Sequence, residues 1–158
     1  MTIVAIDRTN SNLWFPPAGA DRNVIPVWAE CDISATDVDA TTDAILLVGP
    51  MPANSYFPNT AGALWVKLTD MDTGGPSLDI DFGFGAGADG ILDFTLINSA
   101  GGGGAAGNYA SAVVAGQDPW IDVSGLYVIA DVITAATTEA AGTIEVGFLY
   151  SQNVLKDT

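Results

Sequence analysis

The sequence predicts an all-β protein: an antiparallel β-sandwich, jelly-roll-like, with an extended N-terminal arm. Short segments in which apolar and polar residues alternate recur along the chain, as expected of strands that are buried on one face. Between them lies no amphipathic segment of about 12 residues, which parallel βαβ units would require. The composition agrees, because 18 Gly, 8 Pro and 16 Asp among the 19 acidic residues favour turns over helices.

Residues 1–23 are predicted to form the arm, and residues 24–158 the sandwich domain. The arm contains Trp14-Phe15-Pro16-Pro17, a stiff apolar stretch that is not helical. Two interpretations of this stretch stay open: it folds back and plugs the sandwich, or it docks on a neighbouring subunit. The second makes Trp14, Phe15, Pro16 and Pro17 interface residues, because aromatic side chains anchor interfaces.

The domain is predicted to consist of about eight or nine short strands, and eight main strands fit a jelly roll. In Val24–Ile33 the apolar residues fall on one face, while Trp28, Glu30 and Asp32 fall on the other. Ser77–Phe84 alternates most clearly. The remaining predicted strands are Asp43–Val48, Ala63–Thr69, Ile91–Ile97, Tyr109–Val114, Trp120–Val123, Leu126–Thr134 and Thr143–Tyr150. Thr134–Ala141 fits either a helical turn or a long hairpin loop.

A glycine-rich stretch, Gly85-Ala-Gly87-Ala-Asp-Gly90, matches the letters of the dinucleotide-binding fingerprint G-x-G-x-x-G. In that fingerprint the last glycine opens a helix, and an acidic residue follows about 20 residues later. Here the residues after Gly90 are typical of a strand, and no acidic residue lies between Asp93 and Asp118. The stretch is therefore interpreted as a turn between two antiparallel strands.

The charge and residue content exclude several function classes. A net charge of −15 disfavours nucleic acid and anionic membranes as partners. The absence of histidine removes the most common general base and metal ligand, and the single cysteine, Cys31, forms no intrachain disulfide. Neither a secretory signal nor a membrane-spanning segment is expected. No catalytic residue, cofactor or metal is predicted.

The clustered aspartates leave one alternative open. Asp79, Asp81, Asp89 and Asp93 lie close together in sequence, and Asp70 and Asp72 begin a D-x-D pattern. Calcium needs six to eight oxygen ligands, but no complete calcium-binding loop is present. A solvated strand face is the favoured interpretation of Asp79 and Asp81.

Several stretches carry a likeness to a known group of proteins: Val27-Trp-Ala-Glu30, Ala44-Ile-Leu-Leu-Val-Gly-Pro50, Ser77-Leu-Asp-Ile-Asp-Phe-Gly-Phe-Gly85, Gly87-Ala-Asp-Gly-Ile91, Leu126-Tyr-Val-Ile-Ala130 and Gly142-Thr-Ile-Glu-Val146. Together they resemble small jelly-roll virion proteins of tailed bacteriophages, namely capsid decoration (cement) or head-fibre proteins. The resemblance covers about residues 24–150 and includes no catalytic motif.

The resemblance implies a non-enzymatic structural protein that decorates and stabilises the phage head. Because packaged DNA makes the inside of a capsid negative, this acidic chain is expected on the outer capsid surface. The implied partners are the major capsid protein and copies of the chain itself, in a trimer or another homo-oligomer. The alternative is a receptor- or glycan-binding module of a fibre or adhesin, with Tyr56, Phe57, Trp65 or Tyr109 as sugar platforms.

Overall fold

A computed structural model of the chain describes residues 4–8, 12–14, 25–41, 43–75, 77–100 and 106–152. Within these ranges the chain forms strands and one short 3-10 helix, η1 (Ala35–Val38). The strands are β1 (Val4–Asp7), β2 (Asn12–Trp14), β3 (Ile25–Ile33), β4 (Asp43–Val48), β5 (Ser55–Pro58), β6 (Leu64–Leu68), β7 (Asp79–Gly85), β8 (Leu92–Ala100), β9 (Gly107–Ala110), β10 (Trp120–Asp122), β11 (Tyr127–Thr134) and β12 (Gly142–Gln152).

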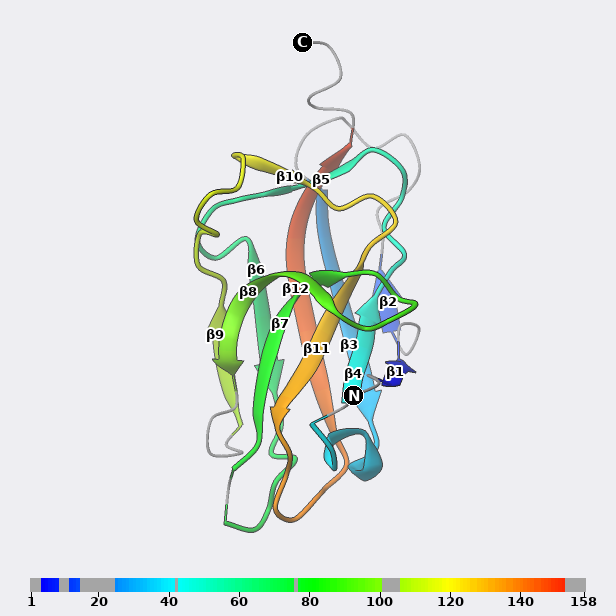
Figure 1. The fold of residues 1–158 in the computed structure, drawn as a ribbon, viewed down its shortest axis with the longest axis vertical. Coiled ribbons are helices and arrows are strands. Elements are labelled where there is room, and N and C mark those ends of the chain that lie inside the picture. The colour runs from blue at the N-terminus through cyan, green and yellow to red at the C-terminus, as the bar shows by residue number, and fades with distance from the viewer. Residues whose placement is uncertain are drawn as a thin grey trace.

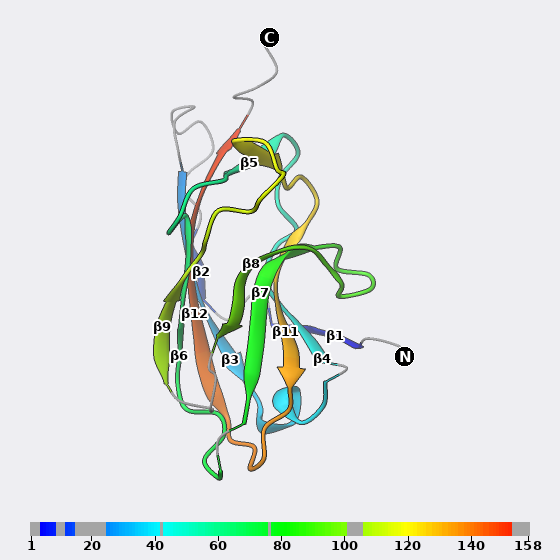
Figure 2. The same ribbon diagram turned by 60° about the vertical axis from the view of Figure 1, so that its left-hand side comes forward.

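The strands form two sheets that pack face to face (Figures 1 and 2). The first has the order β1-β4-β11-β7-β8 and is called the β11 sheet here. In the second, called the β12 sheet, β12 lies between β3 and β6. β2 pairs with the other edge of β3, and β9 pairs with the other edge of β6. β5 pairs with the last two residues of β12, and β10 pairs with β5. The strand pairs are antiparallel, apart from β1 with β4.

The predicted fold class is confirmed. Eight main strands have the order of a jelly roll, with β4-β11-β7-β8 facing β3-β12-β6-β9; apart from the β7–β8 hairpin, each connection between consecutive main strands crosses to the other sheet. The predicted alternation in β3 is confirmed, because Ile25, Val27, Ala29, Cys31 and Ile33 are all buried in the core. Since side chains on a strand alternate between its faces, Trp28 and Asp32 face outward.

Some elements differ from the prediction. β5 and η1 were not predicted from the sequence, because each is only four residues long and shows no hydrophobic periodicity. The segment Thr134–Ala141 contains no helix and continues β11 into a loop that is bridged by Asp72 and Glu139. Two parts of the predicted arm form edge strands, β1 and β2. The arm boundary at residue 23 stays a prediction, because residues 15–24 lie outside the described residues.

The core between the sheets is centred on aromatic rings. Phe84 on β7 contacts Phe57, Phe94 and Phe148, with ring centroids 5.3, 5.8 and 5.8 Å away. Phe57, Phe84 and Phe148 are at most 2% exposed. These contacts connect strands of both sheets, so burial of apolar surface holds the sandwich together.

The G-x-G-x-x-G stretch is a turn between β7 and β8, as predicted. Gly90 has a φ of 68°, which favours glycine, and its N–H donates to Ala86 O over 3.2 Å. A β-carbon at Gly87 would lie 2.5 Å from Cε2 of Tyr127, so this glycine lets the backbone approach the tyrosine ring. The turn projects from the β11 sheet on the side away from the β12 sheet (Figure 2).

Candidate functional site

A row of aromatic positions crosses the β12 sheet. The Cα partners in this row are Trp14 on β2, Trp28 on β3, Gly147 on β12, Trp65 on β6 and Ala110 on β9. Directly paired residues of antiparallel strands lie on the same face of a sheet. The row therefore brings three of the four tryptophan positions of the chain into one line, in which Trp28 and Trp65 face outward.

The middle of this row forms a groove of about 310 Å³ on the outer face of the β12 sheet. Its lining residues are Pro26, Val27, Trp28, Gly62, Ala63, Trp65, Phe148 and Leu149. Trp28 and Trp65 are 37% and 40% exposed, although they are among the largest apolar side chains of the chain. Two indole rings thus present apolar surface to the solvent.

Gly147 leaves room for the Trp65 ring against the backbone of β12. A β-carbon at this glycine would overlap atoms of the indole, including Cε2 and Nε1. The strand on which Trp28 and Trp65 converge therefore carries no side chain between them, and the groove forms in that gap.

The groove lining contains no charged side chain. The nearest outward row two residues along the strands pairs Glu30, Glu145 and Lys67, with 3.4 Å between Lys67 Nζ and Glu145 Oε2. This arrangement favours an apolar or proline-containing ligand, because sugars need polar side chains that bind their hydroxyl groups.

The predicted interface residues are only partly located. Trp14 occupies the β2 end of the aromatic row, directly opposite Trp28. Phe15, Pro16 and Pro17 lie outside the described residues. The sequence does not predict that Trp28 and Trp65 flank Gly147, but it contains a signal for their exposure, because each occupies a polar position in an alternating strand.

The predicted sugar platforms are not gathered at one site. The prediction of Phe57 as a sugar platform is wrong: this residue lies in β5, packs against Phe84 and is fully buried. Tyr56 and Tyr109 are half-buried strand residues, and only Trp65 is well exposed. The sequence pattern failed for Phe57 because the four-residue β5 shows no clear alternation.

The strongest carboxylate interactions are structural. Asp72 is 2% exposed and accepts hydrogen bonds from the backbone N–H groups of Ser77, Leu78, Thr137 and Thr138 at 2.8–3.2 Å. These bonds, the one from Ser77 most of all, hold the pKa of Asp72 well below its usual range. Asp72 thereby ties the loop after β6 to the loop between β11 and β12.

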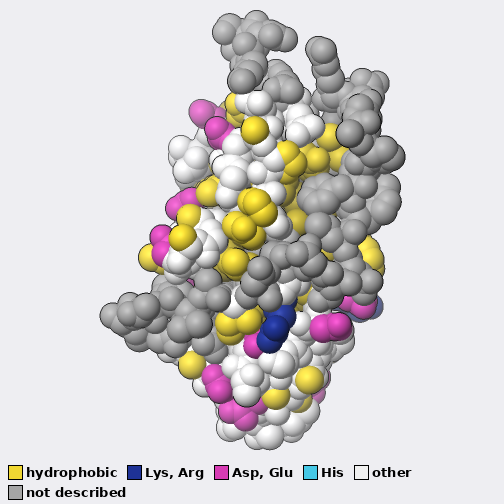
Figure 3. Space-filling view, turned by 90° about the vertical axis from the view of Figure 1, so that its right-hand side faces the viewer, with side chains coloured by type: hydrophobic (Ala, Val, Ile, Leu, Met, Phe, Trp, Pro, Cys, Tyr) yellow, Lys and Arg dark blue, Asp and Glu magenta, His cyan; other side chains and the backbone are white. Residues whose placement is uncertain are grey.

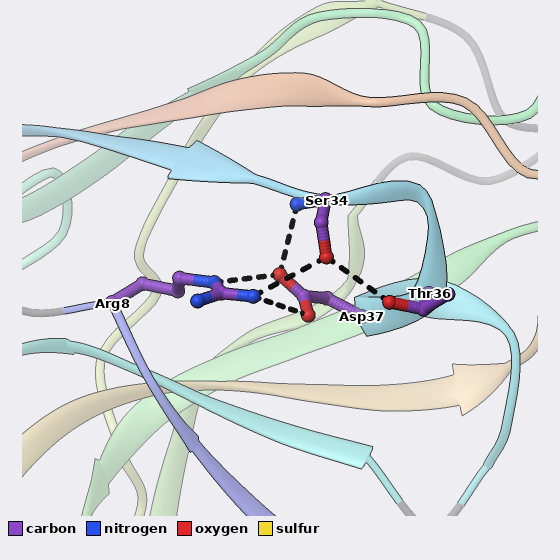
Figure 4. A network of polar contacts seen from close by, with 4 residues as sticks. All are labelled: Arg8, Ser34, Thr36 and Asp37. Carbon is purple, nitrogen blue, oxygen red and sulfur yellow. Dashed lines mark hydrogen bonds and ion pairs between the residues drawn. The ribbon is translucent and has the colours of Figure 1, made fainter.

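A second carboxylate fastens the N-terminal strand (Figure 4). The guanidinium of Arg8, next to β1, donates from Nε and Nη2 to the two oxygens of Asp37 in η1, both over 2.8 Å. Ser34 N–H donates to the same carboxylate over 2.9 Å. Burial would raise the pKa of Asp37, but the hydrogen bonds from Arg8 and Ser34 outweigh it and lower the pKa.

The predicted solvated face of β7 is half-buried. Asp81 is the Cα partner of Asp131 on β11, and burial together with the Asp81 charge raises the pKa of Asp131. Asp79 Oδ1 is buried without a hydrogen-bond partner among the described residues. In the same part of the chain, no three His, Cys, Asp or Glu residues are grouped so as to hold a metal ion.

Cys31 is a core residue. Its thiol donates to Leu47 O over 3.3 Å, and burial, followed by the charges of Asp32 and Glu30, raises its pKa to about 12. The thiol is therefore protonated near neutral pH, and a protonated thiol is a poor nucleophile. Separately, no helix within the described ranges is long and apolar enough to cross a membrane.

The comparisons with known proteins identify the fold. The chain is similar to a chain in the capsid of Ralstonia phage GP4, with a TM-score of 0.67 and 21% identity, over 96% of this chain and 99% of that one. It is also similar to a chain in the capsid asymmetric unit of cyanophage Pam1, with a TM-score of 0.54 and 17% identity, over 90% and 94% of the two chains. No protein-family model and no curated protein matches the sequence.

Proposed function

We propose that the chain is a non-enzymatic structural protein of a bacteriophage particle, which decorates the outer surface of the capsid. The observation that carries this proposal is the whole-chain likeness to a chain from the capsid of phage GP4. This chain spans nearly all of that chain and nearly all of the Pam1 chain, so the likeness extends over the whole fold rather than one motif. The proposed partner is the major capsid protein.

The charge of the chain supports the outer surface. With a net charge of −15, the protein would be repelled by packaged DNA inside a shell. On the face seen in Figure 3, acidic side chains gather at the lower end and along one margin, and basic side chains are few among the described residues. Because the chain has only four Lys and Arg residues, contacts with neighbouring capsid proteins would rely on apolar surface, such as the groove between Trp28 and Trp65, more than on salt bridges.

The carboxylates and the thiol support a structural role. Asp72 and Asp37 are engaged in hydrogen bonds that connect loops and strands of the fold. Cys31 is buried within the core. The groups whose pKa values are most strongly shifted thus serve the fold itself, and the sequence has no histidine to act as a base.

Binding to capsids tests the proposal. Capsids that lack the protein are incubated with increasing amounts of the purified chain, and bound protein is separated by sedimentation. We expect saturable binding to capsids, including capsids filled with DNA, and a higher temperature of capsid disruption. An unrelated acidic protein of similar size and charge is the control. Absence of saturation together with an unchanged disruption temperature would overturn the proposal.

A further inference from the structure

We propose that the Trp28–Trp65 groove binds the Phe15-Pro16-Pro17 segment of a second copy of this chain. This inference goes beyond the proposed capsid role and does not depend on it. It assigns a site on the body to the predicted interface residues of the arm.

The chemistry of the groove fits this segment. Proline rings and aromatic side chains pack on indole faces, and proline-rich stretches bind to grooves lined by aromatic residues. Phe15-Pro16-Pro17 contains the only Pro-Pro pair in the sequence. Because proline stiffens the chain before binding, ordering this segment costs less conformational entropy than ordering an average one.

Charge favours the same pairing. Two copies that each carry a net charge of −15 repel one another over most of their surfaces. Neither the groove lining nor Phe15-Pro16-Pro17 contains a charged residue. The contact therefore joins uncharged parts of two acidic chains, and no acidic group has to be buried.

Geometry favours a second copy over the same copy. Trp14 lies on β2, two strand positions from β12, and adjacent strands are about 4.8 Å apart. The centre of the groove is thus about 10 Å from β2, and three extended residues span at most about 10 Å. Pro17 would reach the groove of its own chain only if residues 15–17 ran fully extended across β3, a restraint that does not apply to the segment of a second copy.

The test uses full-length chains in sedimentation velocity over a wide concentration range. The groove variant carries Trp28→Ser and Trp65→Ser, and the segment variant carries Phe15→Ser, Pro16→Ser and Pro17→Ser. We expect the wild-type chain to self-associate, and the association of each variant to be weaker by a factor of about ten or more. An equimolar mixture of the variants recovers part of the association, because one supplies an intact groove and the other an intact segment.

Controls separate this contact from loss of fold. Ile133→Ser removes an apolar side chain that is 43% exposed on the other sheet, and it leaves association unchanged. Leu149→Ser alters the groove without replacing a tryptophan, and circular dichroism establishes that each variant is folded. A wild-type monomer at all concentrations overturns the proposal. So does association that the segment variant leaves unchanged, or a mixture that recovers nothing, which would mean that each segment binds within its own copy.

Discussion

The two outer faces of the sandwich treat their apolar residues differently. On the β11 sheet, Ala44, Leu46 and Ile129 form a small second cluster that is almost fully buried, with half-buried Leu92 and Tyr127 packed on it. On the β12 sheet, Trp28 and Trp65 remain more than one-third exposed. The β11 sheet therefore covers most of its outward apolar side chains, although Ile133 is 43% exposed, whereas the β12 sheet leaves two adjacent indole rings available to a partner.

The difference originates in local sequence. On the covered face, glycines allow close approach: Tyr127 packs against Gly49 and Gly87, and the turn between β7 and β8 lies on that side of the sheet. On the uncovered face, Gly147 lets the Trp65 ring approach the β12 backbone, but no described segment covers the ring, which is 40% exposed. Glycines thus allow Tyr127 to pack closely on one face and place the exposed Trp65 ring against the strand on the other.

Truncating one residue on each face gives the largest expected contrast. Ile129→Ala should lower the free energy of unfolding by about 2–5 kcal/mol, because a fully buried side chain leaves a cavity. Trp65→Ala should cost about 1–2 kcal/mol, since much of the ring already contacts water. Urea unfolding of both variants measures the two values. Equal losses would mean that Trp65 is as important to the fold as Ile129, contrary to the comparison.

Removal of the Asp72 charge tests how much the hydrogen bonds between loops at the end of the sandwich stabilise the fold, in comparison with packing on its faces. Asp72→Asn should lower the melting temperature at neutral pH, because an amide is a weaker acceptor for the four backbone N–H groups. The lowered pKa of Asp72 means that its stabilisation is present above the ordinary value of 3.8 and is lost as the pH falls through the lowered one.

Melting temperatures measured at several pH values from neutral to acidic test this loss of stabilisation. The wild-type chain should lose more stability on acidification than the Asp72→Asn variant does. Asp118→Asn, which changes an exposed aspartate, is the matched control and should behave as wild type. A control that shifts as much as the Asp72 variant would refute a specific role of this carboxylate.

Adding a methyl group beneath Trp65 sharpens the contrast at the groove. Gly147→Ala should displace the indole and lower the free energy of unfolding by about 1–2 kcal/mol, because the new β-carbon overlaps the ring. Gly75→Ala is the control, since a β-carbon there meets no atom within 4 Å. Self-association should weaken with Gly147→Ala and not with Gly75→Ala. Unchanged stability and association would show that the ring needs no glycine below it.

The smallest expected effect lies on the acidic face. Asp131→Asn should stabilise the protein by about 0.2–1 kcal/mol at pH 7, because it removes a like charge opposite Asp81. Burial and the Asp81 charge raise the pKa of Asp131. The charged Asp131 therefore destabilises the wild-type fold at pH values above the raised pKa, and this destabilisation disappears as the pH falls through the raised pKa towards 3.8. Urea unfolding at several pH values measures the gain, which should shrink on acidification.

The sequence predicted the sandwich better than the groove, for physical reasons. Alternation identifies strands such as β3 (Ile25–Ile33), because burial of one face repeats with the pleat. The apolar run Asp43–Val48 was predicted with the bounds of β4, and it is buried on both faces. The groove depends on register, which brings Trp28, Gly147 and Trp65 into one row from distant parts of the chain. Local sequence patterns do not indicate which strands become neighbours, so the sequence predicts only that Trp28 and Trp65 each lie on the outward face of a strand.

The place of β12 in its sheet has a consequence for synthesis of the protein. This strand, Gly142–Gln152, lies between β3 and β6, both of which leave the ribosome long before it. Until residue 142 and those after it emerge, β3 and β6 have no partner between them, and Phe148 is missing from the core. The sandwich therefore closes only after β12 has been synthesised, and its apolar strands stay open to aggregation or chaperones until then.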